Sequence, residues 1–251
     1  MIRSIPLVLI AMIFTMFRGP KTASMKNRTS LILHLFLAVI VVVELAGRLA
    51  GNINLEYPVK PLIMIWMAVY FLFFRKKKSF TLPVLLAFFF SWVGDILLMF
   101  SGAYEDELFF FSGVGGFFLA QVAYIYVFTR YSESGGKGLL QNRSWTGILF
   151  LVYLGGIYAL LYPHMDGIMK VVILVYAITL VGMSMMALNR GGRVNRDSFR
   201  LVFSGSVLFV ISDSLIAVNK FAMEIPLAGF WIMLTYMAAQ YLITVGLSRE
   251  S

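Results

Sequence analysis

Long apolar runs alternate with short polar segments along almost the whole chain. Several of these runs reach the ~17–25 residues that a helix needs to cross about 30 Å of hydrocarbon. Repeated short segments of alternating polarity, which mark a membrane β-barrel, are absent from the sequence. The pattern predicts eight membrane-spanning helices, at residues 30–47, 57–74, 80–100, 107–129, 145–162, 167–189, 199–219 and 226–247. Because the connections are short, we expect antiparallel neighbours in one bundle.

The composition supports this interpretation. Of the 251 residues, 60% are hydrophobic and only 13% are charged, and the mean hydropathy is +0.87. A soluble domain has roughly half of its residues apolar and about a quarter charged. The sequence therefore predicts an all-α, polytopic transmembrane bundle. The chain has no cysteine, which excludes both a disulfide framework and a thiolate metal site.

Lysine and arginine residues indicate the orientation. The net charge is +9, but the basic residues lie in short clusters between apolar runs, so we interpret them as topology signals and not as a nucleic-acid surface. Sixteen of them fall on one side of the predicted membrane and four on the other. This bias predicts an even number of spans in a plasma or bacterial inner membrane, with both termini in the cytoplasm.

Three segments follow from this organisation. Residues 1–29 form an N-terminal extension whose apolar segment, Ile5–Phe17, is short for a membrane span. It suits an interfacial segment, an uncleaved signal-like stretch or an upstream extension of a chain that starts at Met25. Residues 30–247 form the eight-helix domain, and residues 248–251 form a short cytoplasmic tail.

Two short sequence matches suggest an internal repeat. The segment "GDILL" at 94–98 resembles "SDSLI" at 212–216, and the dipeptide "AQ" at 120–121 recurs at 239–240. Four predicted helices lie within each interval, so the halves would be two parallel four-helix repeats. Chance similarity between apolar segments is the alternative.

An aspartate lies deep in each of two predicted spans. An ionised carboxylate in hydrocarbon costs at least ~2.5–3.5 kcal/mol, so it needs a partner, water, a proton or a function. Asp95 and Asp213 lie on parallel helices, at depths of roughly 22 and 21 Å from the cytoplasmic boundary by helical rise. Equal depth permits a facing pair. The alternative is that each Asp only hydrogen-bonds to neighbouring helices and adds packing specificity.

Other polar residues lie at or near the depth of the two Asp residues. Two glutamines fall deeper, where they would form the floor of a cavity. These residues have an alternative explanation without substrate binding. The lysines can extend their ammonium groups to the membrane interface, and the neutral side chains can form hydrogen bonds within the bundle. The candidate substrate-binding residues are Glu44, Lys60, Asn219, Lys220, Tyr176 and Tyr236, with Gln121 and Gln240 on the floor.

Familiar catalytic motifs are missing. His34 and His164 are the only histidines and are far apart, which disfavours a histidine-rich zinc site. The sequence contains no GxSxG elbow, no Walker motif and no dinucleotide-binding glycine motif. The run "GVGG" at 113–116 favours close helix packing over a phosphate cradle. We therefore expect neither a cofactor nor a metal, and two classes stay open: acid–base chemistry with two carboxylates, and ion-coupled transport.

Five motifs in order and spacing resemble those of the YhhN-like membrane family. They are "VKPLIMIW" (59–66), "SWVGDILLMF" (91–100), "FFLAQVAYIYVF" (117–128), "LFVISDSLIAVNKF" (208–221) and "TYMAAQYLITVG" (235–246), and the similarity covers about residues 30–247. The resemblance implies an eight-helix membrane protein. It also implies the activity of animal members, which are lysoplasmalogenases that cleave the vinyl ether of a lysoplasmalogen.

The resemblance also implies site residues. The positions carried over are Lys60, Asp95, Tyr124, Asp213, Lys220, Tyr236 and Gln240. The chain departs from the family at Gln121, where relatives commonly carry His; loss of a proton carrier there would lower or alter the activity. The expected partners are a lysophospholipid and the bilayer, without nucleic acid. The sequence makes no prediction of the oligomeric state.

The chemistry of a vinyl ether suits a pair of carboxyl groups. Its β-carbon must be protonated, and an anion must then stabilise the oxocarbenium ion, as in glycosidases. Our hypothesis makes one of Asp95 and Asp213 the general acid and the other the stabilising carboxylate, with Lys60 and Lys220 holding the lipid phosphate. The alternatives are a non-enzymatic lipid or proton-coupled transporter and a hydrolase of a different lysolipid.

Overall fold

The computed structural model describes residues 25–76, 78–104, 106–130 and 136–250, with side chains from residue 28 onward. Every regular element in these ranges is helical. The elements are α2 (Met25–Ala50), α3 (Ile53–Phe74), α4 (Thr81–Tyr104), α5 (Glu107–Arg130), α6 (Leu139–Asn142), α7 (Thr146–Leu161), η1 (Tyr162–His164), α8 (Ile168–Asn189), α9 (Arg196–Ala217), η2 (Val218–Ala222) and α10 (Ala228–Ser248).

Eight of the helical segments in the described ranges are long and apolar enough to cross a membrane. The spans that begin at α7 and α9 include the short elements η1 and η2, respectively. All eight predicted spans are confirmed, and their ends lie within a few residues of the predicted ones. The chain is therefore an integral, multi-pass membrane protein. The four-residue helix α6 was not predicted.

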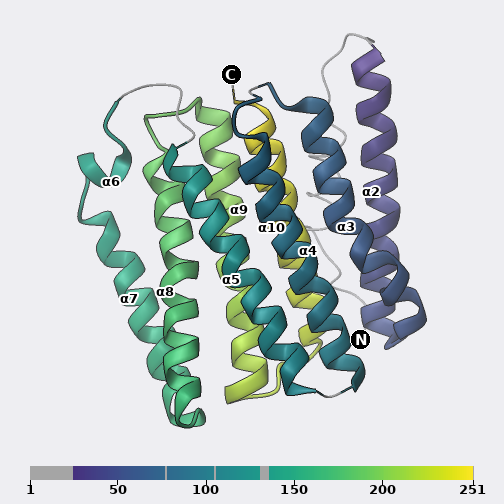
Figure 1. Cartoon of the computed structure of the whole chain (residues 1–251), viewed down its shortest axis with the longest axis vertical. Coiled ribbons are helices and arrows are strands. Elements are labelled where there is room, and N and C mark those ends of the chain that lie inside the picture. The colour runs from purple at the N-terminus through teal and green to yellow at the C-terminus, as the bar shows by residue number, and fades with distance from the viewer. Residues whose placement is uncertain (1–24, 77, 105, 131–135, 251) are drawn as a thin grey trace.

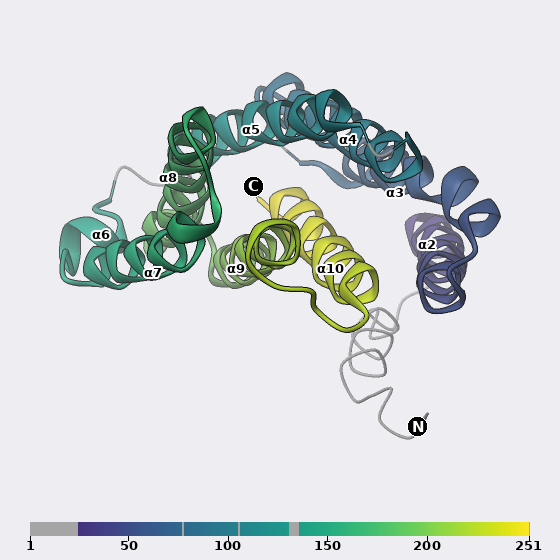
Figure 2. The ribbon, with the colours of Figure 1, turned by 90° about the horizontal axis from the view of Figure 1, so that it is seen from below.

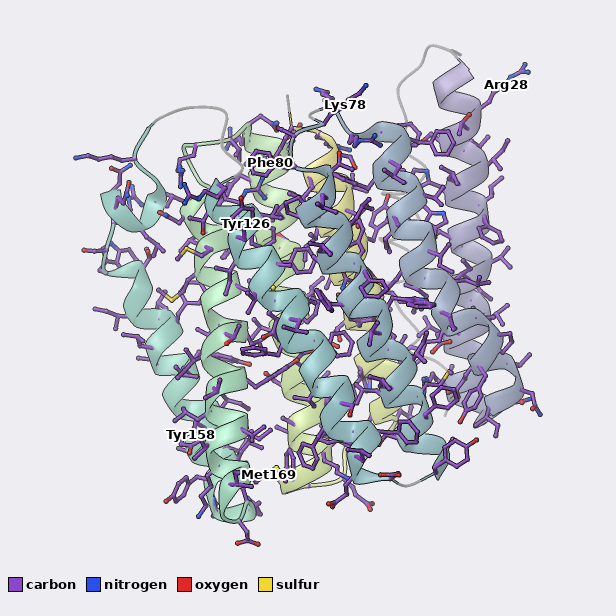
Figure 3. The ribbon with its side chains drawn as sticks, in the orientation of Figure 1. Arg28, Lys78, Phe80, Tyr126, Tyr158 and Met169 are labelled. Carbon is purple, nitrogen blue, oxygen red and sulfur yellow. The ribbon has the colours of Figure 1, made fainter. Side chains whose placement is uncertain are left out.

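Consecutive long helices run in opposite directions, so the start of α2 and the end of α10 lie at the same end of the bundle (Figure 1). Arg28 and Lys78 lie at that end, whereas Tyr158 and Met169 lie at the other (Figure 3). Viewed from below, α2, α3, α4, α5 and α8 form a curved row, with α9 and α10 on its inner side and α7 beyond α8 (Figure 2). This arrangement makes α10 the most enclosed span: 72% of its apolar window is buried, compared with 6% for the span of α7.

A tight turn joins α2 to α3. Gly51 takes a positive φ of 63°, which an L side chain would disfavour. The side chain of Asn52 then caps α3 by accepting a hydrogen bond of 3.1 Å from the backbone N–H of Asn54. The turn brings the last residues of α2 against the first turn of α3, where it positions Arg48 beside Glu56.

Glycines allow two helix pairs to make backbone contact. A Cβ added at Gly116 of α5 would lie 2.9 Å from the backbone nitrogen of Gly94 on α4. A Cβ added at Gly205 of α9 would lie 2.8 Å from the carbonyl oxygen of Ala239 on α10. Small residues at such crossings are typical of membrane helices, because they let the backbones approach. The packing role predicted for the glycine run at 113–116 is confirmed for Gly113 and Gly116.

These two close pairs occupy corresponding places in the chain. The pair α4–α5 comes third and fourth among the eight spans, and α9–α10 comes seventh and eighth. The correspondence agrees with two parallel four-helix repeats, although the origin of the repeat by duplication stays a prediction.

Both ends of the chain were predicted to lie outside the bundle. The apolar segment at 5–17 falls outside the described residues, and α2 begins at Met25, before the predicted start at residue 30. At the other end, Glu250 is fully buried and pairs with Arg190. Its carboxylate also accepts a hydrogen bond of 2.7 Å from the hydroxyl of Ser198. The predicted tail at 248–251 is therefore packed against the bundle as far as the structure describes it.

Candidate functional site

A polar cavity of about 540 Å³ lies between the helices near the end opposite Arg28 and Lys78. The residues that line it come from α2, α3, α4, α5, α9, η2 and α10. We call it the polar cavity because many charged and hydrogen-bonding side chains line it, namely Arg48, Lys60, Asp95, Ser101, Asp106, Ser212, Asp213, Asn219, Lys220 and Tyr236. Most of these are residues that the sequence had singled out.

Asp95 lies in the wall of the polar cavity and is 2% exposed. Its Oδ2 accepts a hydrogen bond of 2.6 Å from the hydroxyl of Tyr236 on α10. The Nε2 of Gln240 donates to Tyr236 at 3.4 Å and to the hydroxyl of Ser91 at 3.1 Å. The hydroxyl of Tyr124 donates to the Oε1 of Gln240 at 2.6 Å. A chain of buried polar groups therefore fixes the orientation of Tyr236, and through it that of Asp95.

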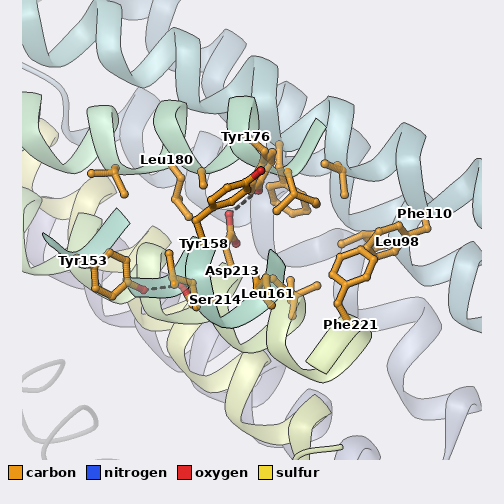
Figure 4. Close-up of a pocket in the computed structure, with 18 residues that line it drawn as sticks. Leu98, Phe110, Tyr153, Tyr158, Leu161, Tyr176, Leu180, Asp213, Ser214 and Phe221 are labelled. Carbon is orange, nitrogen blue, oxygen red and sulfur yellow. Dashed lines mark hydrogen bonds between the residues drawn. The ribbon is translucent and has the colours of Figure 1, made fainter. Parts of the chain in front are cut away.

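Asp213 is held from two other helices. Its Oδ2 accepts hydrogen bonds from the hydroxyl of Tyr176 on α8, at 2.5 Å, and from the Nε2 of Gln121 on α5, at 3.2 Å. Figure 4 shows Tyr176 and Asp213 facing each other. The Oε1 of Gln121 is buried without a hydrogen-bond partner among the described residues. The pattern is crosswise: α10 of the second half holds the Asp of the first half, and α5 of the first half holds the Asp of the second.

Cations form one side of the polar cavity. Lys60 is only 6% exposed and lines the cavity together with Asp95. Arg48 is clamped between Glu44, at 3.2 Å, and Glu56, at 2.7 Å. Glu44 was predicted to bind the substrate, but it does not line the cavity. Its carboxylate is turned toward Arg48, which does line the cavity. Sequence analysis missed Arg48 as a site residue, although its spacing of four residues from Glu44 is the signal of a helical ion pair.

The element η2 is a π-helical turn that continues α9. Such turns widen a helix and are frequent at functional sites. Here the turn brings Asn219 and Lys220 to the polar cavity, and the Nζ of Lys220 lies 5.1 Å from the ring centroid of Phe110. The Oδ1 of Asn219 accepts a hydrogen bond of 2.9 Å from the backbone of Ile225, so this side chain also holds the loop that follows.

A second, smaller space adjoins the polar cavity. This apolar pocket has a volume of about 50 Å³ and is lined mainly by aliphatic and aromatic side chains of α5, α7, α8 and α9. Asp213 and Phe117 line both spaces. In Figure 4, Phe110 and Phe221 mark one end of the apolar pocket and Tyr153 marks the other. Asp213 therefore lies at the junction between a polar and an apolar compartment.

The glutamines differ from their predicted place on the cavity floor. Gln121 contacts Asp213 directly, and Gln240 is one hydrogen bond away from the partner of Asp95. Depth counted along single helices ignores helix tilt and the reach of side chains, so it placed both residues too far from the carboxyl groups. Ser91 was missed, although it precedes Asp95 by four residues and so shares its helix face.

The arrangement supplies proton donors and acceptors. Asp95 and Asp213 are the two buried residues among the three aspartates that line the cavity, and tyrosines or an amide orient their carboxyl groups. Within the described ranges, no group of three or more His, Asp or Glu side chains is placed to hold a metal ion. The residues present suit acid–base chemistry on a molecule with both a polar and an apolar part.

Several curated proteins are similar to this chain. Lysoplasmalogenase TMEM86A of Homo sapiens is 34% identical over 167 residues, and the protein of the same name from Bos taurus is 31% identical over 167 residues. Each match covers 64% of this chain and 64% of the relative. Lysoplasmalogenase TMEM86B of Sus scrofa is 32% identical over 162 residues, which are 64% of this chain and 61% of the relative. The chain thus matches a little less than two thirds of the length of these relatives. No solved structure matches it.

A family model gives the broadest match. The model of the YhhN family matches residues 55–247, a range that holds both aspartates, both cavity lysines and the residues that hydrogen-bond to the two carboxyl groups. The resemblance inferred from the five sequence motifs is confirmed. Since the match extends over most of the chain and all but the first of its spans, this protein belongs to the YhhN family.

Proposed function

We propose that this protein is a membrane-embedded lysoplasmalogenase, which hydrolyses the vinyl ether of a lysoplasmalogen to a fatty aldehyde and a glycerophospho-alcohol. The observation that carries the proposal is the pair Asp95 and Asp213, whose carboxyl groups line one cavity from two helices. The names of the similar curated proteins support the same reaction.

Vinyl ether hydrolysis sets three requirements. An acid must protonate the β-carbon, an anion must stabilise the oxocarbenium ion that results, and water must reach the α-carbon. The β-carbon belongs to the hydrocarbon chain, whereas the ether oxygen belongs to the polar glycerol. An enzyme for this reaction therefore needs its acid on the apolar side of the bond and its stabilising anion on the polar side.

The two aspartates meet these requirements unequally. Asp213 lies at the junction with the apolar pocket, so it is placed to protonate the β-carbon at the start of the chain. Asp95 lines the polar cavity, which it shares with the basic side chain of Lys60, but it does not line the apolar pocket. We therefore assign the acid to Asp213 and the stabilising carboxylate to Asp95.

The proton balance closes with these two groups. Asp213 gives its proton to the β-carbon, and Asp95 takes a proton from the water that adds to the α-carbon. The hemiacetal then returns its hydroxyl proton to Asp213, while Asp95 protonates the departing glycerol oxygen. The products are the aldehyde and the glycerophospho-alcohol, and both carboxyl groups are restored to their starting states. This exchange of acid and base roles is the general logic of carboxylate pairs.

The cations suit a lipid phosphate. Lys60, Lys220 and Arg48 face the polar cavity, and ammonium and guanidinium groups are strong partners for phosphate oxygens. We propose that the end carrying Arg28 and Lys78 faces the cytoplasm, in accordance with the positive charge bias, so that the polar cavity opens toward the opposite side. A lysolipid of that leaflet would then place its ether just below its headgroup, near the aspartates.

Purified protein tests the proposal directly. Protein in detergent is incubated with a lysoplasmalogen, and the aldehyde and glycerophospho-alcohol are measured by mass spectrometry. We expect turnover by the wild type and a loss of at least about 100-fold in folded Asp95→Asn and Asp213→Asn, the usual scale of a lost general acid or base. Wild-type turnover in either variant would contradict the carboxylate mechanism.

The same assay separates the alternatives. Aldehyde release in detergent does not require two compartments, whereas transport does. Protein that releases no product in detergent but moves lysolipid between vesicle leaflets is a transporter. Other products formed from a total lipid extract would identify a hydrolase of a different lysolipid.

A further inference from the structure

Three adjoining spaces lead from the polar cavity past Asp213 to a groove beside α7. The apolar pocket shares Asp213 with the polar cavity. Beyond it lies a lateral groove of about 460 Å³, formed by the first half of α7, the second half of α8 and the middle of α9. The apolar pocket and the lateral groove share Tyr153 and Val181.

A hydrogen bond closes this series between pocket and groove. The hydroxyls of Tyr153 on α7 and Ser214 on α9 lie 2.6 Å apart. Figure 4 shows this pair at one end of the apolar pocket, next to Asp213 along the chain. Both residues line the apolar pocket, and Tyr153 also lines the lateral groove.

We infer that the apolar pocket and the lateral groove bind the hydrocarbon chain of the lysolipid, and that the Tyr153–Ser214 pair is the gate through which the chain enters from the bilayer. The inference rests on the proposed function for the identity of the lipid. It adds a chain-binding site, a route of entry and a gating residue, Tyr153.

The volumes require the groove as well as the pocket. A space of about 50 Å³ admits only a few water-sized groups. A long alkyl chain that starts at Asp213 cannot end inside the apolar pocket, so it must continue past Tyr153. The next space is the lateral groove, whose sides include Leu149, Phe150 and Ile211.

The direction of the series also suits a lipid. From Asp213 the spaces run along α9 in the direction of its N-terminus, as far as Phe203, whereas Lys220 follows the C-terminal end of α9. A lysolipid whose phosphate is held near Lys220 would therefore keep the headgroup-to-tail direction that it has in its own leaflet. It would need to slide sideways between α7 and α9, without turning over.

Helix α7 is the element best suited to move. Only 6% of the apolar window of its span is buried, the lowest fraction among the spans found in the described residues. A Cβ added at Gly155 or Gly156 would meet nothing within 4 Å. Helices with few buried contacts open at low free energy. Displacement of α7 would separate Tyr153 from Ser214 and join the pocket to the groove.

A photo-crosslinking experiment tests the site without catalysis. The probe is a lysophosphoethanolamine with a saturated ether, which the proposed reaction cannot cleave, and a diazirine at the end of its chain. We expect labels on α7 residues 146–153 and α9 residues 203–211 of purified wild-type protein. Labels confined to the polar cavity, or spread over the lipid-facing surface of all helices, would overturn the inference. Because the probe is not cleaved, this result is independent of lysoplasmalogenase activity.

Two alanines provide a matched pair of variants. Ala177 lines the apolar pocket, so Ala177→Phe fills it. Ala159 is exposed on α7, so Ala159→Phe adds the same bulk outside. We expect groove labelling to fall at least about fivefold in folded Ala177→Phe, since the chain loses its apolar contacts, and to stay unchanged in Ala159→Phe. Equal labelling in both would overturn the chain-binding site.

The rate of labelling tests the gate separately from the binding site. Tyr153→Phe keeps the aromatic ring but removes the hydroxyl that bonds to Ser214. We expect the probe to label the groove faster in this variant than in the wild type, while the final extent of labelling stays the same. An unchanged or slower rate would show that the Tyr153–Ser214 pair is not a gate, even if the labelled residues are those expected.

Discussion

The hydroxyl of Tyr236 donates a hydrogen bond of 2.6 Å to the carboxylate of Asp95, across 141 residues of sequence. This bond joins α10, the most enclosed span, to α4 at the wall of the polar cavity. It has a counterpart on the other side of the cavity, where Gln121 of α5 donates to Asp213 of α9. Each carboxyl group thus accepts a hydrogen bond from the opposite half of the chain, and Asp213 accepts a second one from Tyr176 in its own half, so the complete site needs both halves in place.

We predict that Tyr236→Phe lowers the turnover of lysoplasmalogen about 10- to 100-fold with little change in KM. The variant removes a hydrogen bond to a charged group, worth about 1.5–3 kcal/mol, but no contact with the lipid phosphate. Aldehyde release by purified protein measures the effect. Tyr126→Phe is the control, because Tyr126 is 51% exposed on α5. Turnover within twofold of the wild type would show that Asp95 does not depend on Tyr236.

We predict that Gln121→His raises the turnover several-fold. An imidazole at this position can still hydrogen-bond to Asp213, and unlike the amide it can also carry a proton, which is worth about 100-fold or more at an optimal geometry. Gln121→Leu is the comparison: it keeps an uncharged side chain of similar length but loses the hydrogen bond, so its turnover should fall. If His and Leu at this position reduce turnover equally, Gln121 is a positioning residue and not a substitute for a proton carrier.

We predict that Lys220→Met raises KM about tenfold while kcat changes less than threefold. A charge-assisted hydrogen bond to phosphate is formed equally in the ground and transition states, so its loss weakens binding more than chemistry. Steady-state kinetics with a lysoplasmalogen measures both constants. Lys78→Met is the control, since Lys78 lies at the opposite end of the bundle (Figure 3). A fall in kcat alone would place Lys220 in the chemical step.

We predict that Gly116→Leu lowers the stability by about 1–3 kcal/mol, whereas Gly115→Leu does not. A Cβ at Gly116 would lie 2.9 Å from the backbone of Gly94, but a Cβ at Gly115 would meet nothing within 4 Å. The two residues are adjacent on α5, so helix propensity and sequence context are matched. Thermal unfolding in detergent, followed by gel filtration, measures the difference. Equal melting temperatures would show that α4 and α5 do not pack through Gly116.

We predict that a cysteine at Ala103 reacts with an impermeant maleimide only from outside the cell, and a cysteine at Lys78 only from the cytoplasm. The chain has no cysteine of its own, so each single substitution gives an unambiguous label. Both residues are exposed: Ala103 lies in the last turn of α4, and Lys78 lies in the loop that precedes the first residue of α4. The reverse pattern of labelling would invert the orientation and place the polar cavity on the cytoplasmic side.

The sequence by itself determined the fold class, the eight spans and the presence of two acidic groups in apolar helices. Each of these properties depends only on the residues of one segment, because a helix needs about 20 apolar residues to cross the hydrocarbon whatever helices surround it. The same reasoning singled out Asp95 and Asp213, since a carboxyl group at this depth carries a cost that any partner must offset.

Only the tertiary structure decided which side chains meet. The rotation of each helix about its axis, and the choice of its neighbours, depend on packing among all the helices, and small residues such as Gly116 and Gly94 set these distances. For this reason, depth along the helix predicted Gln121 at the floor of the cavity, whereas in the structure its amide donates a hydrogen bond to Asp213. For the same reason, the contact of Tyr153 with Ser214 had no signal in the sequence.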